Sequence, residues 1–258
     1  MKFGLFNLLI VVVLGGCGGG GSDSVLPPLA TATNHACITN NDTMADIDFI
    51  VPAANTHGCI VSNEQAKDGL YSLKFTVNAN DCYDKDCSTD RSRYEIYDNV
   101  NTSTNGKTVQ YRTHLYIPTQ ERFRPRGNNI MFVSQINVRN NEGFYHTLAY
   151  LEIDQTNSLM IRTHQGFTWN IKNKQFVTAS IFDRWISVDY EIKSSTTQGY
   201  LRIWVDGTLF VDENIPTMST TNDYINLKLG IYNAFKSQAI EAFSRQTLFY
   251  DGIKREYK

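Results

Sequence analysis

The feature that most constrains the fold is a series of short segments, rich in β-branched and aromatic residues, that follow one another from Gly69 to the end of the chain. Each is bounded by Asn, Gly, Asp or Ser, which is typical of β-strands separated by turns. Helical periodicity is nearly absent, apart from a turn near 234–243. Strands are expected at 71–77, 91–97, 108–117, 130–138, 147–153, 159–164, 185–192, 200–205, 227–232 and 247–253. The pattern predicts an all-β protein, an antiparallel β-sandwich of the jelly-roll type in which one concave sheet can hold a long ligand.

The first 16 residues carry one lysine, Lys2, and then an apolar run that is too short to span a membrane and is typical of a secretory signal. Leu-Gly-Gly-Cys17 resembles a bacterial lipobox, in which Cys17 becomes the acylated first residue; ordinary signal cleavage is the alternative. Residues 17–33 are rich in Gly, Ser, Pro and Thr and form a flexible tether.

Three parts are therefore expected: a lipoprotein signal peptide at 1–16, the tether at 17–33 and one β domain at 34–258. The localisation expected is the bacterial outer membrane, at the cell surface or on its periplasmic face, with secretion as the alternative. The membrane would be contacted through the lipid alone.

Four cysteines remain after Cys17, an even number in an exported chain, which predicts two disulfides. Of the three pairings, we favour Cys82 with Cys87 and Cys37 with Cys59. Metal ligation by these thiols is disfavoured because there is no Cys-x-x-Cys pair.

Removal of Lys2 with the signal leaves 23 basic residues against 26 acidic ones, which gives no indication of a nucleic-acid-binding protein. A polyanionic ligand would have to be held by local positive charge. We expect a monomer.

The segment 226–233 is the candidate binding strand. Its alternation directs Leu227, Leu229 and Ile231 to one face, which is expected to be core, and Lys228, Gly230 and Tyr232 to the other. The second face combines an ammonium, a phenol and a glycine that leaves room for a flat ligand, and it therefore predicts a binding groove.

This Lys-x-Gly-x-Tyr strand resembles a signature of the jelly-roll polysaccharide lyases, namely the alginate lyases and the heparin lyase I and glucuronan lyase group. Their version is close to Tyr-Phe-Lys-x-Gly-x-Tyr, and Asn226 and Leu227 stand where the family has Tyr and Phe. The segments 185–194, 199–207 and 249–253 are similar to the same family, so the resemblance extends from about Gly69 to the C-terminus.

The resemblance implies a polysaccharide lyase that cleaves a uronate-containing polysaccharide, of the ulvan, glucuronan or alginate class, by β-elimination and leaves an unsaturated uronate. That reaction needs a group that neutralises the carboxylate, a base that takes the C5 proton and an acid that protonates the leaving O4 oxygen.

Residues 91–97 place Arg91, Arg93, Glu95 and Tyr97 on one face of a strand. Arg93 and Glu95 are similar to the family's Arg-x-Glu pair. Arginine suits a carboxylate because its planar fork donates two parallel hydrogen bonds. We expect Arg93 to neutralise the uronate, Glu95 to orient an arginine and Arg91 to bind substrate; the alternative is an exposed cross-strand ion pair.

Gln135, Ile136 and Asn137 resemble the Gln-Ile-His strand of alginate lyases, and Gln135, Asn137 and Arg139 share one face. Asn137 replaces the histidine, and an amide can donate a hydrogen bond but cannot take a proton near neutral pH. We expect Gln135 and Asn137 to neutralise the carboxylate and Arg139 to bind substrate. The alternative is that the two amides are structural.

Tyr232 matches the tyrosine that the family uses as acid and, in several members, as base. An ordinary phenol has a pKa near 10, and Lys228, the expected substrate-holding residue, and Arg93 would stabilise phenolate. If the C5 proton and O4 lie on opposite sides of the ring, a second base is needed. His146 is the first candidate, followed by His114 and His164.

No cofactor is required by this chemistry. Calcium is an alternative use of Asp81, Asp84, Asp86 and Asp90, for which a solvated acidic loop is the simpler interpretation. The basic loop of Arg122, Arg124 and Arg126 could steer a polyanion.

Two other functions are weighed against the lyase. A non-catalytic cell-surface glycan-binding lipoprotein would need no base, in keeping with Asn137. A glycoside hydrolase would need two facing carboxylates, and no strand carries such a pair.

Overall fold

The computed structural model describes residues 49–50, 58–78, 81–82, 84–119, 130–140, 145–154, 156–164, 167, 171–177, 180–234 and 245–258. The chain divides into two compact units, 1–33 and 34–258, and every described residue lies in the second. The signal peptide, the tether, Cys17, Cys37, the basic loop at 122–126 and most of the expected turn at 234–243 fall outside the described residues. Within the described part, no helix is long and apolar enough to cross a membrane.

The second unit is built from two seven-stranded sheets, and the described strand pairings within them are antiparallel. The first sheet has the order β1-β4-β13-β6-β7-β8-β9 and the second β12-β11-β10-β5-β14-β3-β2. A 3₁₀ helix, η1 (Asp84–Ser88), precedes β4. The strands are β1 (Phe49–Ile50), β2 (Cys59–Ser62), β3 (Ser72–Asn78), β4 (Arg91–Asp98), β5 (Thr108–Tyr116), β6 (Ile130–Arg139), β7 (Tyr145–Ile153), β8 (Leu159–His164), β9 (Ile171–Val177), β10 (Trp185–Lys193), β11 (Tyr200–Val205), β12 (Thr208–Asn214), β13 (Tyr224–Ala234) and β14 (Arg245–Tyr257).

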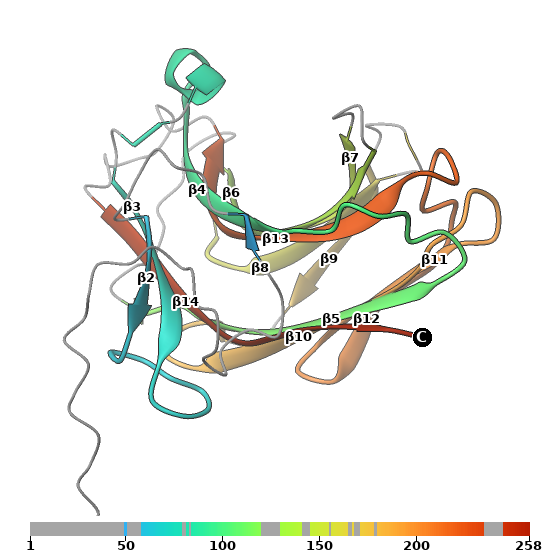
Figure 1. The fold of residues 1–258 in the computed structure, drawn as a ribbon. Coiled ribbons are helices and arrows are strands. Elements are labelled where there is room, and N and C mark those ends of the chain that lie inside the picture. Colours follow the sequence, from blue (N-terminus) through green and yellow to red (C-terminus); the bar gives the residue numbers. More distant parts are fainter. Residues whose placement is uncertain are drawn as a thin grey trace, which may run out of the picture. The chain divides into compact units, whose positions relative to one another are not determined.

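This architecture confirms the predicted antiparallel sandwich, and each expected strand is present. β1, β2, β9 and β12 were not among the expected strands, and β14 is longer than its apolar segment. Figure 1 shows the two sheets as stacked layers: β4, β13, β6 and β7 form a trough whose open side faces away from β5, β10 and β14. The outer face of the first sheet is therefore concave.

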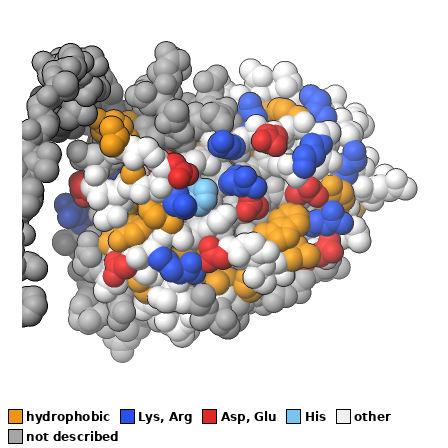
Figure 2. Space-filling view, turned by 90° about the horizontal axis from the view of Figure 1, so that it is seen from below, with side chains coloured by type: hydrophobic (Ala, Val, Ile, Leu, Met, Phe, Trp, Pro, Cys, Tyr) orange, Lys and Arg blue, Asp and Glu red, His pale blue; other side chains and the backbone are white. Residues whose placement is uncertain are grey.

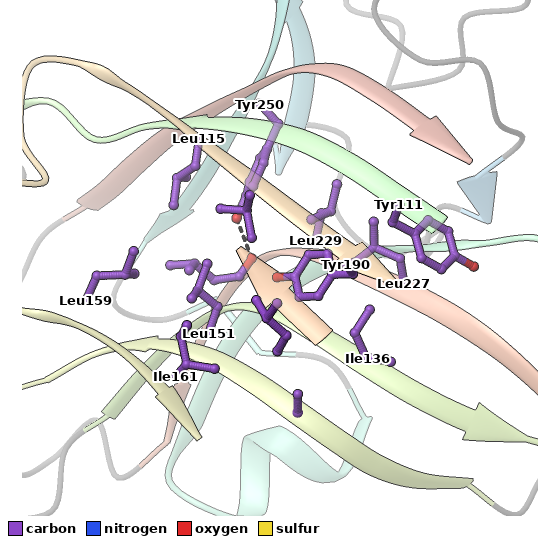
Figure 3. Packing of buried hydrophobic residues seen from close by; sticks show 14 of the residues in the cluster. Tyr111, Leu115, Ile136, Leu151, Leu159, Ile161, Tyr190, Leu227, Leu229 and Tyr250 are labelled. Atoms are coloured by element: carbon purple, nitrogen blue, oxygen red, sulfur yellow. Dashed lines mark hydrogen bonds between the residues drawn. The ribbon is translucent and has the colours of Figure 1, made fainter. Parts of the chain in front are cut away.

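The core lies between the sheets and is formed by the inward half of each alternating strand. Leu227, Leu229 and Ile136 of the first sheet meet Leu115 and Tyr190 of the second (Figure 3). Burial of this apolar set is the main favourable term in forming the sandwich.

Three buried tyrosines of the second sheet also bridge the layers with their hydroxyls. Tyr111 donates to Asp98 Oδ2 at 2.7 Å, Tyr190 donates to Ser134 Oγ at 2.9 Å and Tyr250 donates to the backbone carbonyl of Val133. Because a buried hydroxyl without a partner is costly, these bonds fix how the sheets sit on each other.

Two irregularities interrupt the first sheet where it faces Tyr250. The β13–β6 register shifts between Leu229 and Tyr232, and the β6–β7 register shifts between Phe132 and Ser134. The Tyr250 hydroxyl lies 3.4 Å from the carbonyl oxygen of Gly230, inside the first shift. The Tyr250 hydroxyl therefore lies within hydrogen-bonding distance of the carbonyl oxygens of Val133 and Gly230, at the two bulges that interrupt the regular ladder.

A glycine is required at position 230 by its backbone conformation and by the close approach of β4, and not by a ligand in the groove. Its φ is 144°, and a Cβ there would lie 2.2 Å from the carbonyl oxygen of Tyr94 and 2.8 Å from Glu95 Cα. The expectation that this glycine leaves room for a flat ligand is therefore wrong. The missing side chain makes room for β4.

Candidate functional site on the concave face

β13 places its two halves as the sequence predicts. Leu227, Leu229 and Ile231 are fully buried in the core cluster, so Lys228 and Tyr232 lie on the concave face. Tyr232 is the cross-strand partner of Arg93 on β4 and of Phe132 on β6, and its ring centroid is 5.2 Å from that of Phe132. The phenol thus sits between two strands that each carry predicted site residues.

The Glu95 side chain contacts three other predicted site residues. Its side chain is 7% exposed, and Oε1 accepts a hydrogen bond from Gln135 Nε2. Oε2 lies 3.6 Å from Arg93 Nη1 and 3.7 Å from Lys228 Nζ. A buried carboxylate needs such compensation, and these contacts are those expected of a residue that orients an arginine.

Arg93 is held from a second side by Asp86. Its Nε donates to Asp86 Oδ2 at 2.5 Å, and its Cζ lies 4.9 Å from the centroid of the Tyr232 ring. Burial opposes the charge of Arg93, but Glu95 and Asp86 outweigh burial and the pKa of the guanidinium is raised. Arg93 therefore stays cationic beside the phenol.

Sequence reasoning missed the role of Asp86. It treated Asp86 as one of four acidic residues of a solvated or calcium-binding loop, whereas the side chain is 1% exposed and paired with Arg93. Among the described residues, no group of three or more His, Cys, Asp or Glu is arranged to hold a metal. The position of Asp86 inside the Cys82–Cys87 loop was the available signal.

The pKa of Tyr232 is raised from its ordinary value of 10.0, chiefly by burial. Arg91 and Arg93 lower it, Glu95 and Asp86 raise it, and burial decides the net direction. The positive charge of Arg93 acts as expected, but it does not make the phenol more acidic overall. In this state Tyr232 is a proton donor.

Asn137 is fully buried, and the Thr147 hydroxyl donates to its Oδ1 at 2.7 Å. Its cross-strand partner on β13 is Asn226, which is also fully buried. Among the described residues, Asn137 Nδ2 and both amide atoms of Asn226 have no hydrogen-bond partner. Two of the three positions that depart from the family pattern are therefore direct neighbours, and the burial of Asn137 favours the alternative that this amide is structural.

Arg139 lies at the far end of the same face, with its Cζ 5.1 Å from the centroid of the Tyr97 ring. Arg91 is at the other end, 5.8 Å from the centroid of Tyr232. The predicted binding arginines thus lie at opposite ends of the β4–β13–β6 surface.

The histidines are not beside Tyr232. His146 is 1% exposed, and its ring centroid lies 5.5 Å from those of His164 and Phe167. Its neighbour on β6 is Val138, six positions from Phe132, which is roughly 20 Å along a regular strand. The structure does not bring His146, the first reserve base, next to the phenol.

His164 lies on β8, one strand farther from β13 than His146 on β7. Its ring centroid is 5.2 Å from that of Tyr150, and its Nδ1 is 2.8 Å from the carbonyl oxygen of Thr147. Burial lowers the pKa of His164, so the ring stays neutral near pH 7. His114 lies on β5 and alternates with core residue Leu115, which directs it to the outer face of the second sheet, away from Tyr232.

The concave face also carries the buried carboxylate of Glu152, which pairs with Arg162 at 2.6 Å. Glu152 is on β7 and Glu95 on β4, so three strand spacings, about 14 Å, separate the two strands. Glycoside hydrolysis uses carboxyl groups about 5–9.5 Å apart. Glu95 and Glu152 therefore do not form such a pair, and Asp86 and Glu95 are both engaged by Arg93.

The outer face of the second sheet has a different character. Figure 2 shows basic and acidic side chains interspersed there, and cross-strand pairs such as Arg112 with Asp189, at 2.6 Å, account for the pattern. A cavity of about 350 Å³ on this face is lined by residues that include Trp204 and Glu191. It lies away from Tyr232, and we assign the site to the concave face because the cationic residues converge there.

The Cys82–Cys87 disulfide is confirmed, with Cα atoms 5.0 Å apart. Cys59 is disulfide-bonded and fully buried, and its predicted partner, Cys37, lies outside the described residues.

Comparisons with known proteins agree with the fold. The family model described as "Polysaccharide lyase" matches residues 37–254. Among solved structures, an endo-β-1,4-glucuronan lyase from the fungus Trichoderma reesei has a TM-score of 0.62 and 18% identity, covering 85% of this chain and 94% of its own. A family 7 alginate lyase crystallised with substrate has a TM-score of 0.55 and 13% identity, covering 74% of this chain and 80% of its own. The marine alginate lyase AlyA1 from Zobellia galactanivorans has a TM-score of 0.52 and 12% identity, covering 73% and 80%. No curated protein matched the sequence.

Proposed function

Because the chain belongs to the polysaccharide lyase family, we propose that it cleaves a uronate-containing acidic polysaccharide by β-elimination and leaves an unsaturated uronate at the new end. The observation that carries this proposal is the convergence of Arg93, Lys228 and Gln135 on Glu95, with Arg93 also lying against the ring of Tyr232. The positive charges of Arg93 and Lys228 supply the local attraction that a polyuronate needs in a chain with no net basic charge.

In the proposed reaction, Arg93 forms an ion pair with the uronate carboxylate and stabilises the charge that develops there. A base removes the C5 proton, and the electron pair of that bond forms the double bond between C4 and C5. The C4–O4 bond breaks, and its electron pair leaves on O4, which takes the proton of Tyr232. The raised pKa of Tyr232 suits this acid role.

Two groups are proposed for the base. Tyr232 can act first as base and then as acid if the C5 proton and O4 lie on the same side of the sugar ring. If they do not, we propose His164, whose ring stays neutral near pH 7 and lies 5.2 Å from that of Tyr150, the cross-strand partner of Gln135. Gln135 and Asn137 would then support the carboxylate site from below, since both are buried.

The substrate is proposed to be a glucuronan, alginate or ulvan. The structural relatives include a glucuronan lyase and alginate lyases, which favours the first two polymers for the first trials. No cofactor is proposed, so a chelator such as EDTA should leave the rate unchanged. Loss of activity that calcium restores would contradict this.

The direct test is the rise in ultraviolet absorbance from the conjugated double bond, measured on a panel of purified polyuronates. We expect turnover on at least one polymer, and we expect Tyr232→Phe to abolish it while leaving polymer binding nearly intact. Tyr200→Phe is the matched control, because Tyr200 lies on β11 of the other sheet. An active Tyr232→Phe variant would remove the phenol from the mechanism.

A second function, non-catalytic binding of a glycan at the cell surface, is favoured by one observation. Asn137 stands where the resembling lyases have a histidine, and its side chain is fully buried. Polymer binding without any absorbance change across the panel would support this alternative.

We also propose export and acylation at Cys17, with the enzyme held at the outer membrane. Mass spectrometry of the protein from a bacterial host should detect a lipidated Cys17, and Cys17→Ser should release the domain from the membrane fraction. A membrane-bound Cys17→Ser variant would contradict the lipid anchor.

A further inference from the structure

The loop before β4 turns one acidic side chain into the active-site trough. In Figure 1 this loop, which contains η1, stands above the start of β4 on the open side of the trough. Asp86 is 1% exposed, whereas the following residues, Cys87, Ser88 and Thr89, are exposed. Asp86 is therefore directed inward from a surface loop.

Asp86 and Glu95 hold the guanidinium of Arg93 from two sides. Asp86 Oδ2 accepts from Nε at 2.5 Å, and Glu95 Oε2 lies 3.6 Å from Nη1. The Arg93 side chain is still 27% exposed, so part of it remains accessible to a ligand. A guanidinium oriented this way presents a fixed donor edge to an incoming carboxylate.

The Cys82–Cys87 disulfide closes the loop around Asp86. A 3₁₀ helix has poorer hydrogen-bond geometry than an α-helix, so a five-residue one gains little stability from its own backbone. A crosslink that spans it restricts the positions that Asp86 can take.

We propose that Asp86 is a positioning residue for Arg93, and that the Cys82–Cys87 disulfide acts on the active site by holding Asp86 in place. The prediction about turnover rests on the proposed lyase function, whereas the prediction about binding does not. The disulfide of an exported enzyme thereby becomes part of its active site.

The test is a double-mutant cycle measured on the polyuronate that the wild-type enzyme cleaves. Asp86→Asn keeps the size of the side chain but removes its charge, and Cys82→Ser/Cys87→Ser opens the loop. We expect each to lower kcat/KM by about tenfold to a hundredfold, since a small displacement of a positioning group can cost that much. The triple variant should lose at most about threefold more, because both changes act through one contact.

Two further variants serve as controls. Asp81→Asn alters an acid of the same loop that accepts hydrogen bonds from Asn78, and it should keep wild-type kcat/KM. Asp86→Glu keeps the charge but displaces it by one methylene, and it should lose activity if position matters. If the serine variant does not fold, as judged by thermal melting, the two Asp86 variants decide the matter.

Binding gives a readout that needs no turnover. In a Tyr232→Phe background, calorimetry should show that Asp86→Asn and the opened loop weaken the binding of a uronate oligosaccharide to similar extents. Losses that multiply in the triple variant, or a wild-type affinity for Asp86→Asn, would overturn the proposal. A wild-type enzyme that binds but cleaves no polyuronate would refute the lyase function and leave this test intact.

Discussion

At the scale of single residues, Tyr232 shows burial and charge acting in opposite directions on one proton. Two arginines favour the phenolate, but desolvation and two carboxylates favour the phenol, and the pKa ends above 10.0. A phenol that stays protonated can donate its proton to O4 without first having to gain one. The same property leaves little phenolate to act as a base near neutral pH.

The pH dependence of kcat separates these two roles. If Tyr232 acts as the acid, ionisation of Tyr232 will not lower the rate until the pH exceeds 10, because the phenol keeps its proton up to that point. If it must begin as phenolate, the rate should still be rising at pH 9–10. A pH–rate profile of the wild type beside Arg91→Gln, which removes a charge that lowers this pKa, measures the difference. In that variant the limb assigned to Tyr232 should move to higher pH, and an unmoved limb would exclude Tyr232 as its source.

His164 should make stability depend on pH. Its pKa in the folded protein is lowered from 6.5 by burial, so the unfolded chain binds more protons between the two pKa values. Stability should therefore fall as the pH drops below about 6.5 and level off below the folded pKa. The melting temperature of His164→Gln should fall less than that of the wild type over this window. Parallel curves would contradict the assignment.

At the scale of elements, β13 determines the site because it carries core residues, two functional residues and a bulge within one strand. The bulge at Gly230 lies between Lys228 and Tyr232, so it sets how these side chains face Arg93 and Gln135 across the neighbouring strands. A regular strand would pair them differently.

Gly230→Ala tests this element. The new Cβ would meet the backbone of Tyr94 at 2.2 Å in a conformation that L-residues rarely adopt, so β4 and β13 must separate. We expect a loss of about 3 kcal/mol or more in the free energy of unfolding, measured by urea denaturation. Gly207→Ala is the control, since Gly207 also has a positive φ but a Cβ there meets nothing within 4 Å. A loss of about 1 kcal/mol is expected at that turn. Equal losses would mean that backbone strain, and not the contact with β4, explains Gly230.

At the scale of the whole β-sandwich unit, the two sheets are joined by apolar packing and by phenolic hydroxyls that reach from the second sheet to the first. Tyr250 serves the carbonyl of Val133 beside one bulge and that of Gly230 within another. The second sheet therefore stabilises the irregular backbone on which the concave site is built.

Tyr250→Phe should cost about 1–3 kcal/mol, because buried carbonyl oxygens lose their donor while the apolar contacts remain. Tyr257→Phe is the control, since Tyr257 is 43% exposed and should change stability by less than about 0.5 kcal/mol. Urea denaturation measures both. An unchanged free energy of unfolding for Tyr250→Phe would show that water replaces the phenol.

Local pattern was sufficient for much of this protein. Alternation within each strand predicted that Arg93 and Glu95 of β4 share a face, as do Lys228 and Tyr232 of β13, because side chains in a strand have a period of two. The resemblance to the lyases placed these faces and that of Gln135 in one site. The Cys82–Cys87 disulfide was predictable because only five positions separate the cysteines.

Tertiary structure alone decided which of these residues meet and in what chemical state. The Asp86–Arg93 pair, the close approach of Gly230 to β4, the distance of His146 from Tyr232 and the raised pKa of the phenol depend on register, bulges and burial. Those quantities are set by contacts between segments far apart in the chain. The sequence of a single strand therefore predicts on which face each side chain lies, but it does not predict which residues of other strands that side chain contacts.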